Sequence, residues 1–460
     1  MNVRQWFCAV VLAVAGLRSV ASGQDVVLGG TVVTPDTVIT NGWVVVKSGR
    51  IDSILTERPR SGEARIIETR GIIFPAFVDL HNHPMYNAFE RWKPAGRFKN
   101  RYEWRDLQQY KDLVGTPGSE LQRKDDQTFC DLDEYAEVRA LIGGTTSITG
   151  ISGRRGMNPP VPKCVAGLVR NLDWASGFYG STGSERVENA LGVTPRDMKP
   201  SDAARLGDEI QTSKIDLLLI HVAEGVPLDL ESTLEFLALK GWNLLGKHTA
   251  IIHGTALSPE DFKQMKAAGV ALVWSPRSNI ELYGITTDVV TAHQQGVTIA
   301  LAPDWSPTGS SNMLAEIRYA SRFSREQLSS VFSDKMLFEM ATGIPARVAG
   351  IDGKVGSIRQ GLYADLFVLK GDTAQPFTSL AQSKPDDVQL VLIGGVPLYG
   401  TEGLMRQFGV PLEAVDVCGT PMQLNATALP NGRLADAMQR LTDDLKQHNL
   451  RLAPLAECAH

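Results

Sequence analysis

The chain has 460 residues, a formal net charge of −5, 43% hydrophobic residues and 21% charged residues. This composition is typical of a folded globular protein and excludes a disordered chain. A mildly acidic protein is a poor candidate for general nucleic-acid binding, so we expect no nucleic-acid partner. The length suits a barrel of about 250 residues together with a second, smaller domain.

Residues 1–22 have the pattern of a secretory signal peptide. Arg4 precedes an apolar run from Phe7 to Leu17, and mostly small residues follow from Val20 to Gly23. A charged start, a short apolar core and small residues at the cleavage point are typical of such signals. The run is also too short to span a bilayer. We therefore expect export to the periplasm or the medium and no stable membrane span, with a retained N-terminal anchor as the alternative.

Four cysteines lie beyond this segment: Cys130, Cys164, Cys418 and Cys458. Their spacing contains no C-x-x-C, which argues against a cysteine zinc site. In an oxidising compartment they can form disulfides in any of three pairings. A bridge between Cys418 and Cys458 that fixes the tail is favoured, and free buried thiols are the alternative.

The segments 23–75 and 349–400 share one pattern of short apolar runs separated by turn residues. Examples are the runs at 42–46, 364–369 and 388–393. Such runs are typical of β-strands, and we expect the two ends of the chain to pair into one small β-sandwich domain. Residues 401–460 are expected to form a tail with one amphipathic helix that packs on the body, because four residues share a helical stripe: Leu434, Met438, Leu441 and Leu445.

Between residues 76 and 348, short apolar runs alternate with segments of helical period, such as 230–239 and 259–268. This alternation is typical of βα units with a parallel sheet. The runs 215–220 and 297–302 are almost entirely apolar, as expected for strands buried on both faces. The sequence therefore predicts an α/β fold, and a (β/α)8 TIM barrel or a doubly wound sheet would explain these runs.

Five of the apolar runs end in residues that bind metals or polarise substrates: His81 and His83, His221, His253, Ser275 to Asn279, and Asp304. In a parallel barrel these strand ends converge on one rim, where catalytic residues collect. His81 and His83 are two positions apart, so both side chains point the same way and can bind one ion. The chain has only eight histidines, and four lie at these strand ends. The combination predicts a metal site.

These residues resemble the motifs of the amidohydrolase superfamily, specifically its cytosine deaminase-like and chlorohydrolase-like branch of metal-dependent hydrolases. The resemblance covers residues 25 to 400 approximately and rests on FPAFVDLHNH at 74–83, HVAE at 221–224, HG at 253–254, SPRSN at 275–279, and Asp304. It implies the (β/α)8 barrel. It also implies that the metal ligands are His81, His83, His221 and Asp304, that Glu224 is the proton shuttle, and that His253 polarises the substrate or orients the attacking water. Asp304 would in addition accept the first proton from that water.

The resemblance further implies one divalent metal ion, with zinc as the default and iron or manganese as alternatives. Other branches use two metals bridged by a carboxylated lysine at the end of the fourth strand, and no lysine occurs from Cys164 to Met198. Two departures from the family pattern are Ala76, where glycine is common, and Pro84 directly after the second histidine. They leave the ligands intact but make the shape of the following loop uncertain.

The expected function is hydrolysis of a non-peptide carbon–nitrogen bond in a small molecule, by attack of a metal-bound hydroxide. Deamination and opening of a cyclic amide use the same attack, so both stay open. A two-metal peptidase or lactonase is the first alternative, disfavoured by the missing lysine. A non-catalytic barrel scaffold is the second, disfavoured because all six key positions are filled. Homo-oligomer formation through the outer helices also stays open.

Four residues are candidates for substrate contact: Ser278, Asn279, Trp92 and Arg97. Ser278 and Asn279 follow the seventh strand and either bond the substrate or cap the loop. Trp92 and Arg97 belong to a long insertion, Pro84 to Tyr110, in which aromatic and basic residues alternate. Long loops at a catalytic rim often form lids or specificity elements, which would imply an aromatic or anionic substrate. The alternative is that the aromatic residues pack the insertion onto the barrel.

Overall fold

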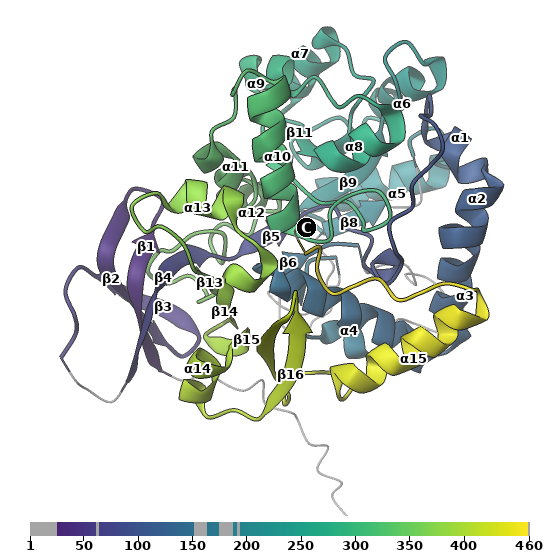
Figure 1. Ribbon diagram of the computed structural model, residues 1–460. Coiled ribbons are helices and arrows are strands. Elements are labelled where there is room, and N and C mark those ends of the chain that lie inside the picture. The colour runs from purple at the N-terminus through teal and green to yellow at the C-terminus, as the bar shows by residue number, and fades with distance from the viewer. Residues whose placement is uncertain (1–24, 61–63, 151–162, 174–186, 191–193, 459–460) are drawn as a thin grey trace, which may run out of the picture.

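The computed structural model describes residues 25–60, 64–150, 163–173, 187–190 and 194–458, and the signal segment predicted at 1–22 lies outside them. Figure 1 shows two regions, a barrel surrounded by helices and a β-sheet beside it, to which both ends of the chain contribute. No helix in the described ranges is long and apolar enough to cross a membrane.

The strands from the two ends of the chain form one mixed sheet of nine strands in the order β16-β17-β15-β14-β13-β4-β1-β2-β3. Their bounds are β1 (Val26–Val33), β2 (Val38–Lys47), β3 (Arg50–Leu55), β4 (Arg65–Pro75), β13 (Leu366–Leu369), β14 (Val388–Ile393), β15 (Val396–Thr401), β16 (Leu412–Val417) and β17 (Thr420–Asn425). β4 joins the two ends, because it pairs parallel with β1 and antiparallel with β13. The predicted pairing of the two ends is confirmed, as one continuous sheet.

This sheet has a hydrophobic core of its own, built from alternating residues of both ends. Leu28 on β1, Val44 on β2, Ile73 on β4 and Leu366 on β13 belong to one buried cluster. Side chains two positions apart on a strand share a face, so a period of two places them together. β4 ends at Pro75 and the first barrel strand starts two residues later. The sheet therefore fixes the start of the barrel.

Eight short strands form the barrel in two parallel, hydrogen-bonded groups, β5-β6-β7 and β8-β9-β10-β11-β12. Their bounds are β5 (Phe77–Asp79), β6 (Thr145–Ile148), β7 (Arg170–Asn171), β8 (Val187–Ala190), β9 (Leu217–Val222), β10 (Thr249–His253), β11 (Ala271–Trp274) and β12 (Ile299–Leu301). A parallel bridge between Asn82 and Asp304 connects the carboxyl ends of the first and last strands. The predicted barrel architecture is confirmed.

Helices follow most of the strands and cover the barrel. Their bounds are α1 (Arg101–Asp106), α2 (Gln108–Tyr110), α3 (Thr116–Lys124), α4 (Asp126–Ile142), α5 (Pro200–Gln211), α6 (Leu230–Gly241), α7 (Pro259–Ala268), α8 (Pro276–Tyr283), α9 (Val289–Gln294), α10 (Met313–Gln327), α11 (Asp334–Met340), α12 (Gly343–Val348), α13 (Pro376–Gln382), α14 (Glu402–Met405) and α15 (Leu434–Gln447). α6 and α7 correspond to the two helices expected at 230–239 and 259–268. Local features fix both ends of α7. Ser258 and Asp261 form a capping box at its start, and Gly269 ends the helix in a left-handed conformation.

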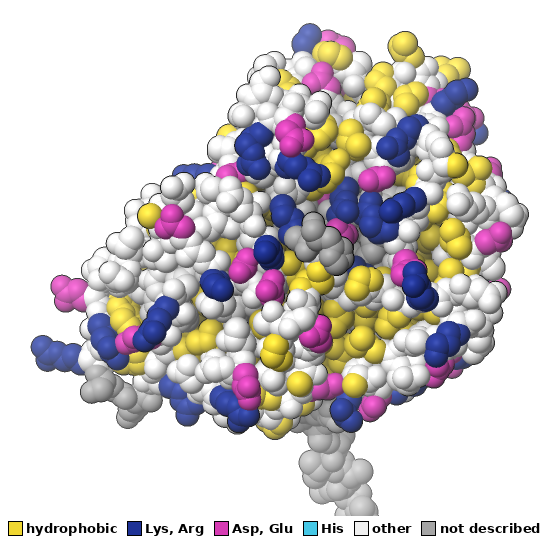
Figure 2. Space-filling model, in the orientation of Figure 1, with side chains coloured by type: hydrophobic (Ala, Val, Ile, Leu, Met, Phe, Trp, Pro, Cys, Tyr) yellow, Lys and Arg dark blue, Asp and Glu magenta, His cyan; other side chains and the backbone are white. Residues whose placement is uncertain are grey.

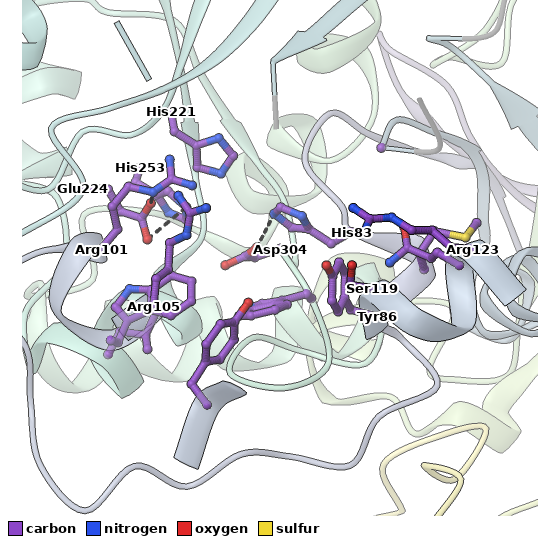
Figure 3. Close-up of a pocket in the computed structure, with 17 residues that line it drawn as sticks. His83, Tyr86, Arg101, Arg105, Ser119, Arg123, His221, Glu224, His253 and Asp304 are labelled. Carbon is purple, nitrogen blue, oxygen red and sulfur yellow. Dashed lines mark ion pairs between the residues drawn. The ribbon is translucent and has the colours of Figure 1, made fainter. Parts of the chain in front are cut away.

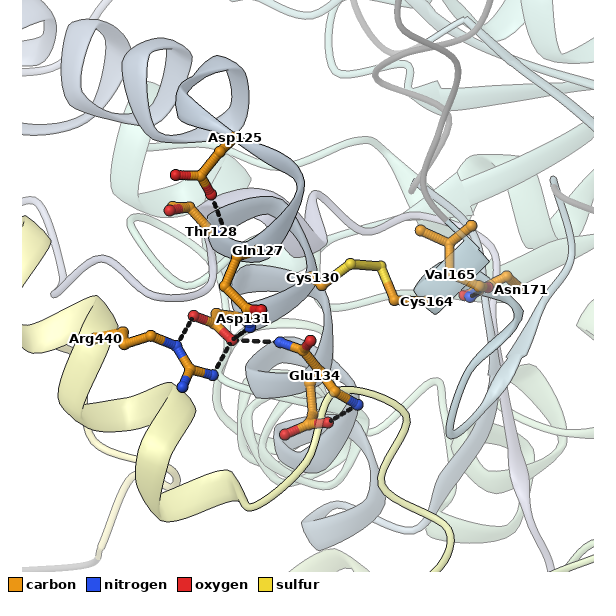
Figure 4. Close-up of a disulfide and its surroundings, with 11 residues drawn as sticks. Asp125, Gln127, Thr128, Cys130, Asp131, Glu134, Cys164, Val165, Asn171 and Arg440 are labelled. Carbon is orange, nitrogen blue, oxygen red and sulfur yellow. Dashed lines mark hydrogen bonds and ion pairs between the residues drawn. A yellow bond between two sulfur atoms is a disulfide. The ribbon is translucent and has the colours of Figure 1, made fainter.

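The predicted tail helix is α15, and it packs against α4. Leu441 and Leu445 are buried, and Arg440 makes two 2.7 Å hydrogen bonds to Asp131 on α4 (Figure 4). The tail also contains β16 and β17, which the sequence analysis did not anticipate. Beyond α15 the chain returns to the barrel, where the backbone nitrogen of Ala453 donates to the carbonyl of Ala88.

The tail ends on the carboxyl-end side of the barrel strands. Glu457 lies 2.6 Å from Arg277, at the start of α8, and 3.8 Å from Arg91. Figure 2 shows basic side chains gathered around the end of the chain on this face. These ion pairs hold the last residues against the loops that follow β5 and β11.

The described residues contain two disulfides. Cys418 pairs with Cys458, as favoured from the sequence, and Cys130 on α4 pairs with Cys164. Figure 4 shows the second bridge between α4 and the segment that precedes β7. The Cys418–Cys458 bridge links the end of β16 to the last described residues, and it thereby connects the terminal sheet to the tail that contacts the barrel.

Replacing Cys418 and Cys458 together with serine should lower the free energy of unfolding by about 4 kcal/mol, the chain-entropy value for a loop of this size. The two cysteines are 40 positions apart. Urea denaturation of the oxidised proteins measures the difference. With reductant the two proteins should unfold at similar urea concentrations, and a difference below about 1 kcal/mol in the oxidised state would contradict the prediction.

Candidate metal and catalytic site

The predicted metal-binding residues meet at the carboxyl ends of the barrel strands. His81 and His83 follow β5, His221 lies near the end of β9, His253 ends β10, and Asp304 follows β12. Two sets of three have their ligand atoms within 4.8 Å of one another: His81 with His221 and His253, and His81 with His83 and Asp304. The structure therefore brings together all four predicted ligands, and it adds His253 to the same cluster.

The atoms of this cluster fit a divalent metal ion. Both ring nitrogens of His81 and Nδ1 of His221 are buried and have no hydrogen-bond partner among the described residues. Nε2 of His81 lies 3.0 Å from Oδ1 of Asp304, and Nε2 of His83 lies 3.4 Å from the same oxygen. Buried polar atoms normally have partners, and imidazoles with one carboxylate are a common donor set for such ions.

The protonation states also suit metal binding. Burial lowers the pKa of His83 to about 3, and burial lowers the pKa of His221 well below its usual range. Both imidazoles are thus neutral near pH 7, as metal ligands must be. Burial alone would raise the pKa of Asp304, but the neighbouring His81 outweighs it and holds that pKa below its usual range. The carboxylate is therefore ionised.

Backbone contacts hold the first and last strand ends together at this cluster. The nitrogen of Asp304 donates to the carbonyl of His81, and the nitrogen of His83 donates to the carbonyl of Asp304, both at 3.1 Å. Asp304 has a φ of 67° and His253 a φ of 66°, in the left-handed region that non-glycine residues rarely adopt. Such strained backbone persists where the surroundings fix it, and it is concentrated at functional sites.

Asp79 fixes the turn that carries His81 and His83. One carboxylate oxygen accepts the backbone nitrogen of His81 at 3.0 Å, and the other accepts the side-chain amide of Asn82 at 2.7 Å. Asn82 in turn accepts from the side chain of Asn87 at 2.9 Å. Asp79 belongs to the FPAFVDLHNH motif at 74–83, but its role in fixing the turn is visible only in the structure.

Glu224 lies beside this cluster and is held by two side chains from distant segments. Tyr283 donates its hydroxyl to Oε1 at 2.6 Å. Nε of Arg101 lies 3.4 Å from Oε2, and Figure 3 shows Arg101 beside Glu224. Trp104 donates its indole nitrogen to the Tyr283 hydroxyl at 2.9 Å. Nε2 of His253 is 3.9 Å from Oε1. The carboxylate therefore faces both the histidine cluster and a fixed network of donors.

His253 is oriented by Asn279. Nδ1 of His253 lies 2.8 Å from Oδ1 of Asn279, while the Asn279 amide nitrogen donates to Thr286. In this orientation of the Asn279 amide, its nitrogen donates to Thr286 and its oxygen faces His253, where it accepts the Nδ1 proton. Nε2 of His253 is then the unprotonated nitrogen, and it faces the cluster.

A pocket of about 300 Å³ lies next to this cluster. Its lining includes the predicted metal-binding and acid–base residues His83, His221, Glu224, His253 and Asp304. Its walls are aromatic and basic, formed by Tyr86, Trp104, Tyr110, Trp305, Arg101, Arg105 and Arg123. Several of these wall residues come from the insertion after β5, which thus contributes to the pocket as well as packing on the barrel.

The four candidates for substrate contact lie behind or beside this lining. Ser278 is buried and bonds the Thr308 hydroxyl at 2.9 Å, and Asn279 bonds His253. Trp92 is buried in an aromatic cluster with Trp104, and exposed Arg97 pairs with Glu281. None of the four is among the residues that line the described pocket, and their contact with a substrate stays a prediction.

Several residues at the site were not predicted from the sequence. Tyr283 lies 59 positions beyond Glu224, and Arg123 lies on α3, outside the insertion named above. Arg101 and Arg105 belong to the insertion from Pro84 to Tyr110, whose basic residues were given no individual role from the sequence. Their positions at a spacing of four on α1, with Trp104 between them, could have indicated one shared helix face.

Replacing Asn279 with alanine should leave metal affinity within about tenfold of that of the unmodified protein, because the side chain that Asn279 orients, His253, lies beside the four proposed ligands and is not one of them. Competition with a chelator of known affinity measures the change. Ser278→Ala is the matched control, since this neighbouring hydroxyl bonds Thr308 and not a histidine. A loss of about 10- to 100-fold in Asn279→Ala alone would show that His253 itself binds the metal.

Comparison with known proteins agrees with this geometry. Residues 210–398 match the amidohydrolase family. The chain is 24% identical over 406 residues to the 5-methylthioadenosine/S-adenosylhomocysteine deaminase of Symbiobacterium thermophilum, which covers 78% of this chain and 89% of that protein. Its fold matches an adenosine deaminase from Xanthomonas campestris with bound zinc, with a TM-score of 0.68 and 16% identity over 93% of this chain and 99% of that one. It also matches a mutant of the atrazine chlorohydrolase of Arthrobacter aurescens complexed with zinc and atraton, with a TM-score of 0.63 and 15% identity over 81% and 95% of the two chains. Residues 210–398 thus match the amidohydrolase family, and the chain is similar to deaminases in sequence and to a deaminase and a chlorohydrolase in fold.

Proposed function

We propose that this protein is a zinc-dependent hydrolase that cleaves a non-peptide carbon–nitrogen bond in a small molecule, by deamination or by hydrolysis of an amide. The observation that carries the proposal is the position of Glu224, an acid–base group beside a buried set of histidines and Asp304 in one pocket. The names of the relatives support it, since they include deaminases, and two related structures contain zinc.

In the proposed reaction a water oxygen bonds to the carbon that bears the nitrogen, and the carbon–nitrogen bond breaks. For an amino-heterocycle the products are the oxo compound and ammonia: one water proton ends on the departing nitrogen and the other on a ring nitrogen of the oxo tautomer. His81, His83, His221 and Asp304 would hold the metal. A divalent ion bound there would lower the pKa of water and polarise the bond under attack.

Three side chains of the protein then orient the water and transfer its protons. Asp304 is ionised and accepts a proton from the attacking water. His253 Nε2, left unprotonated by the bond from Nδ1 to Asn279, accepts a hydrogen bond from that water and orients it. Glu224 carries the proton to the departing nitrogen. This orienting role for His253 is favoured over polarising the substrate, because a nitrogen without a proton cannot donate to a carbonyl oxygen.

Tyr283 and Arg101 keep the Glu224 carboxylate in place. Burial and the neighbouring Glu224 raise the pKa of Tyr283 well above its usual range, so the phenol stays protonated and continues to donate. Burial opposes the charge of Arg101, but Glu224 and Glu235, together with nearby tyrosines, outweigh it and raise the pKa of the guanidinium. Two fixed donors thus limit Glu224 to movements between the water and the leaving nitrogen.

A single metal ion is part of the proposal. The fourth barrel strand, β8, has the sequence VENA and contains no lysine that could bridge two ions. The two-metal peptidase or lactonase is therefore the weaker candidate. The scaffold alternative is disfavoured because the ligands, Glu224 and His253 gather in one pocket.

Metal analysis with two variants tests the function. Purified protein should contain about one equivalent of zinc, and His221→Ala should lose it. Glu224→Gln should keep the metal but lower the rate of ammonia release by roughly 10²- to 10⁴-fold, the usual contribution of a general acid–base group. Ammonia release from a panel of amino-heterocycles and amides provides the assay.

The matched control is His248→Ala, because His248 precedes β10 and bonds the backbone of Asp216 away from the cluster. It should keep both metal and activity. Two equivalents of metal would favour the peptidase or lactonase alternative. No metal after reconstitution with zinc would favour the scaffold.

Export from the cytoplasm is a further part of the proposal. The signal-like pattern at 1–22 supports it, and so do the two disulfides, which persist in oxidising compartments. N-terminal sequencing of the protein recovered from the periplasm or the medium should give a start close to residue 23. A start at Met1 in a membrane fraction would indicate a retained anchor, and a start at Met1 in the cytoplasm would contradict export.

A further inference from the structure

The charges that line the pocket are unbalanced. Three arginines, Arg101, Arg105 and Arg123, face two carboxylates, Glu224 and Asp304. Asp304 is engaged by His81 and His83, and Glu224 is engaged by Tyr283 and Arg101. Within the described ranges, neither Arg105 nor Arg123 has a carboxylate within ion-pair distance. Two positive charges at the pocket wall therefore have no counter-charge from the lining itself, and a bound divalent ion would add to this excess.

Helices α1 and α3, in the segment after β5, each present one face to the pocket. α1 contributes Arg101, Trp104 and Arg105, and α3 contributes Ser119, Gln122 and Arg123. Both sets have the spacing i, i+3, i+4, which places side chains on one side of a helix. Figure 3 shows Arg105 on the side of Glu224, and Arg123 with Ser119 on the side of His83 and Tyr86. The α3 face thus offers a cation and a hydroxyl side by side.

A second observation points to a ligand at this wall. The Arg101 side chain is 6% exposed; its Nε forms the 3.4 Å ion pair with Glu224, whereas its Nη1 has no hydrogen-bond partner among the described residues. Buried guanidinium donors are normally satisfied by an acceptor. Arg101 lines the same pocket, so the pocket contains a buried donor that a ligand oxygen could satisfy.

The remaining wall is aromatic. Trp104 packs edge-on against Tyr110 with ring centroids 5.0 Å apart, and Trp305 packs against Tyr86 at 5.7 Å. All four rings line the pocket. Fixed aromatic rings favour a planar ligand that can stack or pack edge-on between them. A pocket of about 300 Å³ has room for one such ring system with small substituents.

We propose that the substrate is an aromatic or heteroaromatic compound that carries a carboxylate, bound by Arg123 and Ser119 on α3. The ring lies between the aromatic walls, and the carbon–nitrogen bond is directed at Glu224. Arg105 attracts the anion from the opposite wall without contacting it directly. An arginine fork binds a planar carboxylate through two parallel hydrogen bonds, which is why this anion is chosen. The inference rests on the proposed function for the placement of the carbon–nitrogen bond.

Isothermal titration calorimetry of the zinc-loaded protein tests the carboxylate site without turnover. The probes are 4-aminobenzoate and 4-aminobenzamide, which differ in one charge. The acid should bind at least about tenfold more tightly than the amide, as expected for a charge-assisted pair of hydrogen bonds. Arg123→Gln should abolish this preference, Arg123→Lys should restore part of it, and Arg105→Gln should reduce it less than about fivefold.

Lys93→Gln is the matched control, because it removes one exposed positive charge from the insertion that carries Arg105, without touching the pocket lining. It should keep the preference for the acid. Equal binding of acid and amide to the unmodified protein would overturn the proposal. So would a preference that survives Arg123→Gln, since the carboxylate would then be bound elsewhere, for instance by the metal.

The ammonia assay separates this inference from the proposed function. If amino-heterocycles with and without a carboxylate release ammonia at equal kcat/KM, the function holds and the carboxylate site is wrong. If no compound releases ammonia while the acid preference depends on Arg123, the binding site holds and the proposed chemistry is wrong.

Discussion

The site depends on one pair of backbone hydrogen bonds, which join the segment after the first barrel strand to the segment after the last. Asp304 and the His81–His83 segment exchange these bonds, so the carboxylate stands 3.0 Å from the imidazole of His81. Without this closure the ligands would belong to two separate loops. The strained backbone at Asp304 is held by the same contacts, and so the geometry of the cluster is set before any ion binds.

The pocket divides its tasks between two kinds of structure. Strand ends supply the residues for metal binding and proton transfer, and these are rigid because the strands are buried. The insertion after β5 supplies most of the aromatic and basic wall, including Trp104 and Arg105 on α1. The two parts meet at Glu224, which follows a strand but is held by Tyr283 and by Arg101. A change in the insertion can therefore affect the chemistry as well as the choice of substrate.

The sequence predicted the barrel and the gathering of its ligands because both follow from local pattern. A polar residue directly after a buried strand, such as His221, has only one rim to occupy. It did not predict the contact of Tyr283 with Glu224, because nothing near either residue specifies that pairing. It missed Arg123 because an exposed arginine on a helix looks like any solvated charge. β16 was missed although its residues alternate between buried and exposed positions, since its polar residues resemble a loop.

The terminal sheet has a consequence for how the molecule folds. Phe74 at the end of β4 pairs with Phe367 on β13, and their rings stack, although the two residues are 293 positions apart, 367 − 74, in the sequence. Contacts between residues so far apart in sequence form slowly, because a long loop must close first. The strand that leads into the metal-binding segment therefore gains its second neighbour only after β13, which ends at Leu369, has been synthesised. A ribosome-bound chain that ends before β13 would carry a barrel whose first strand lacks this support.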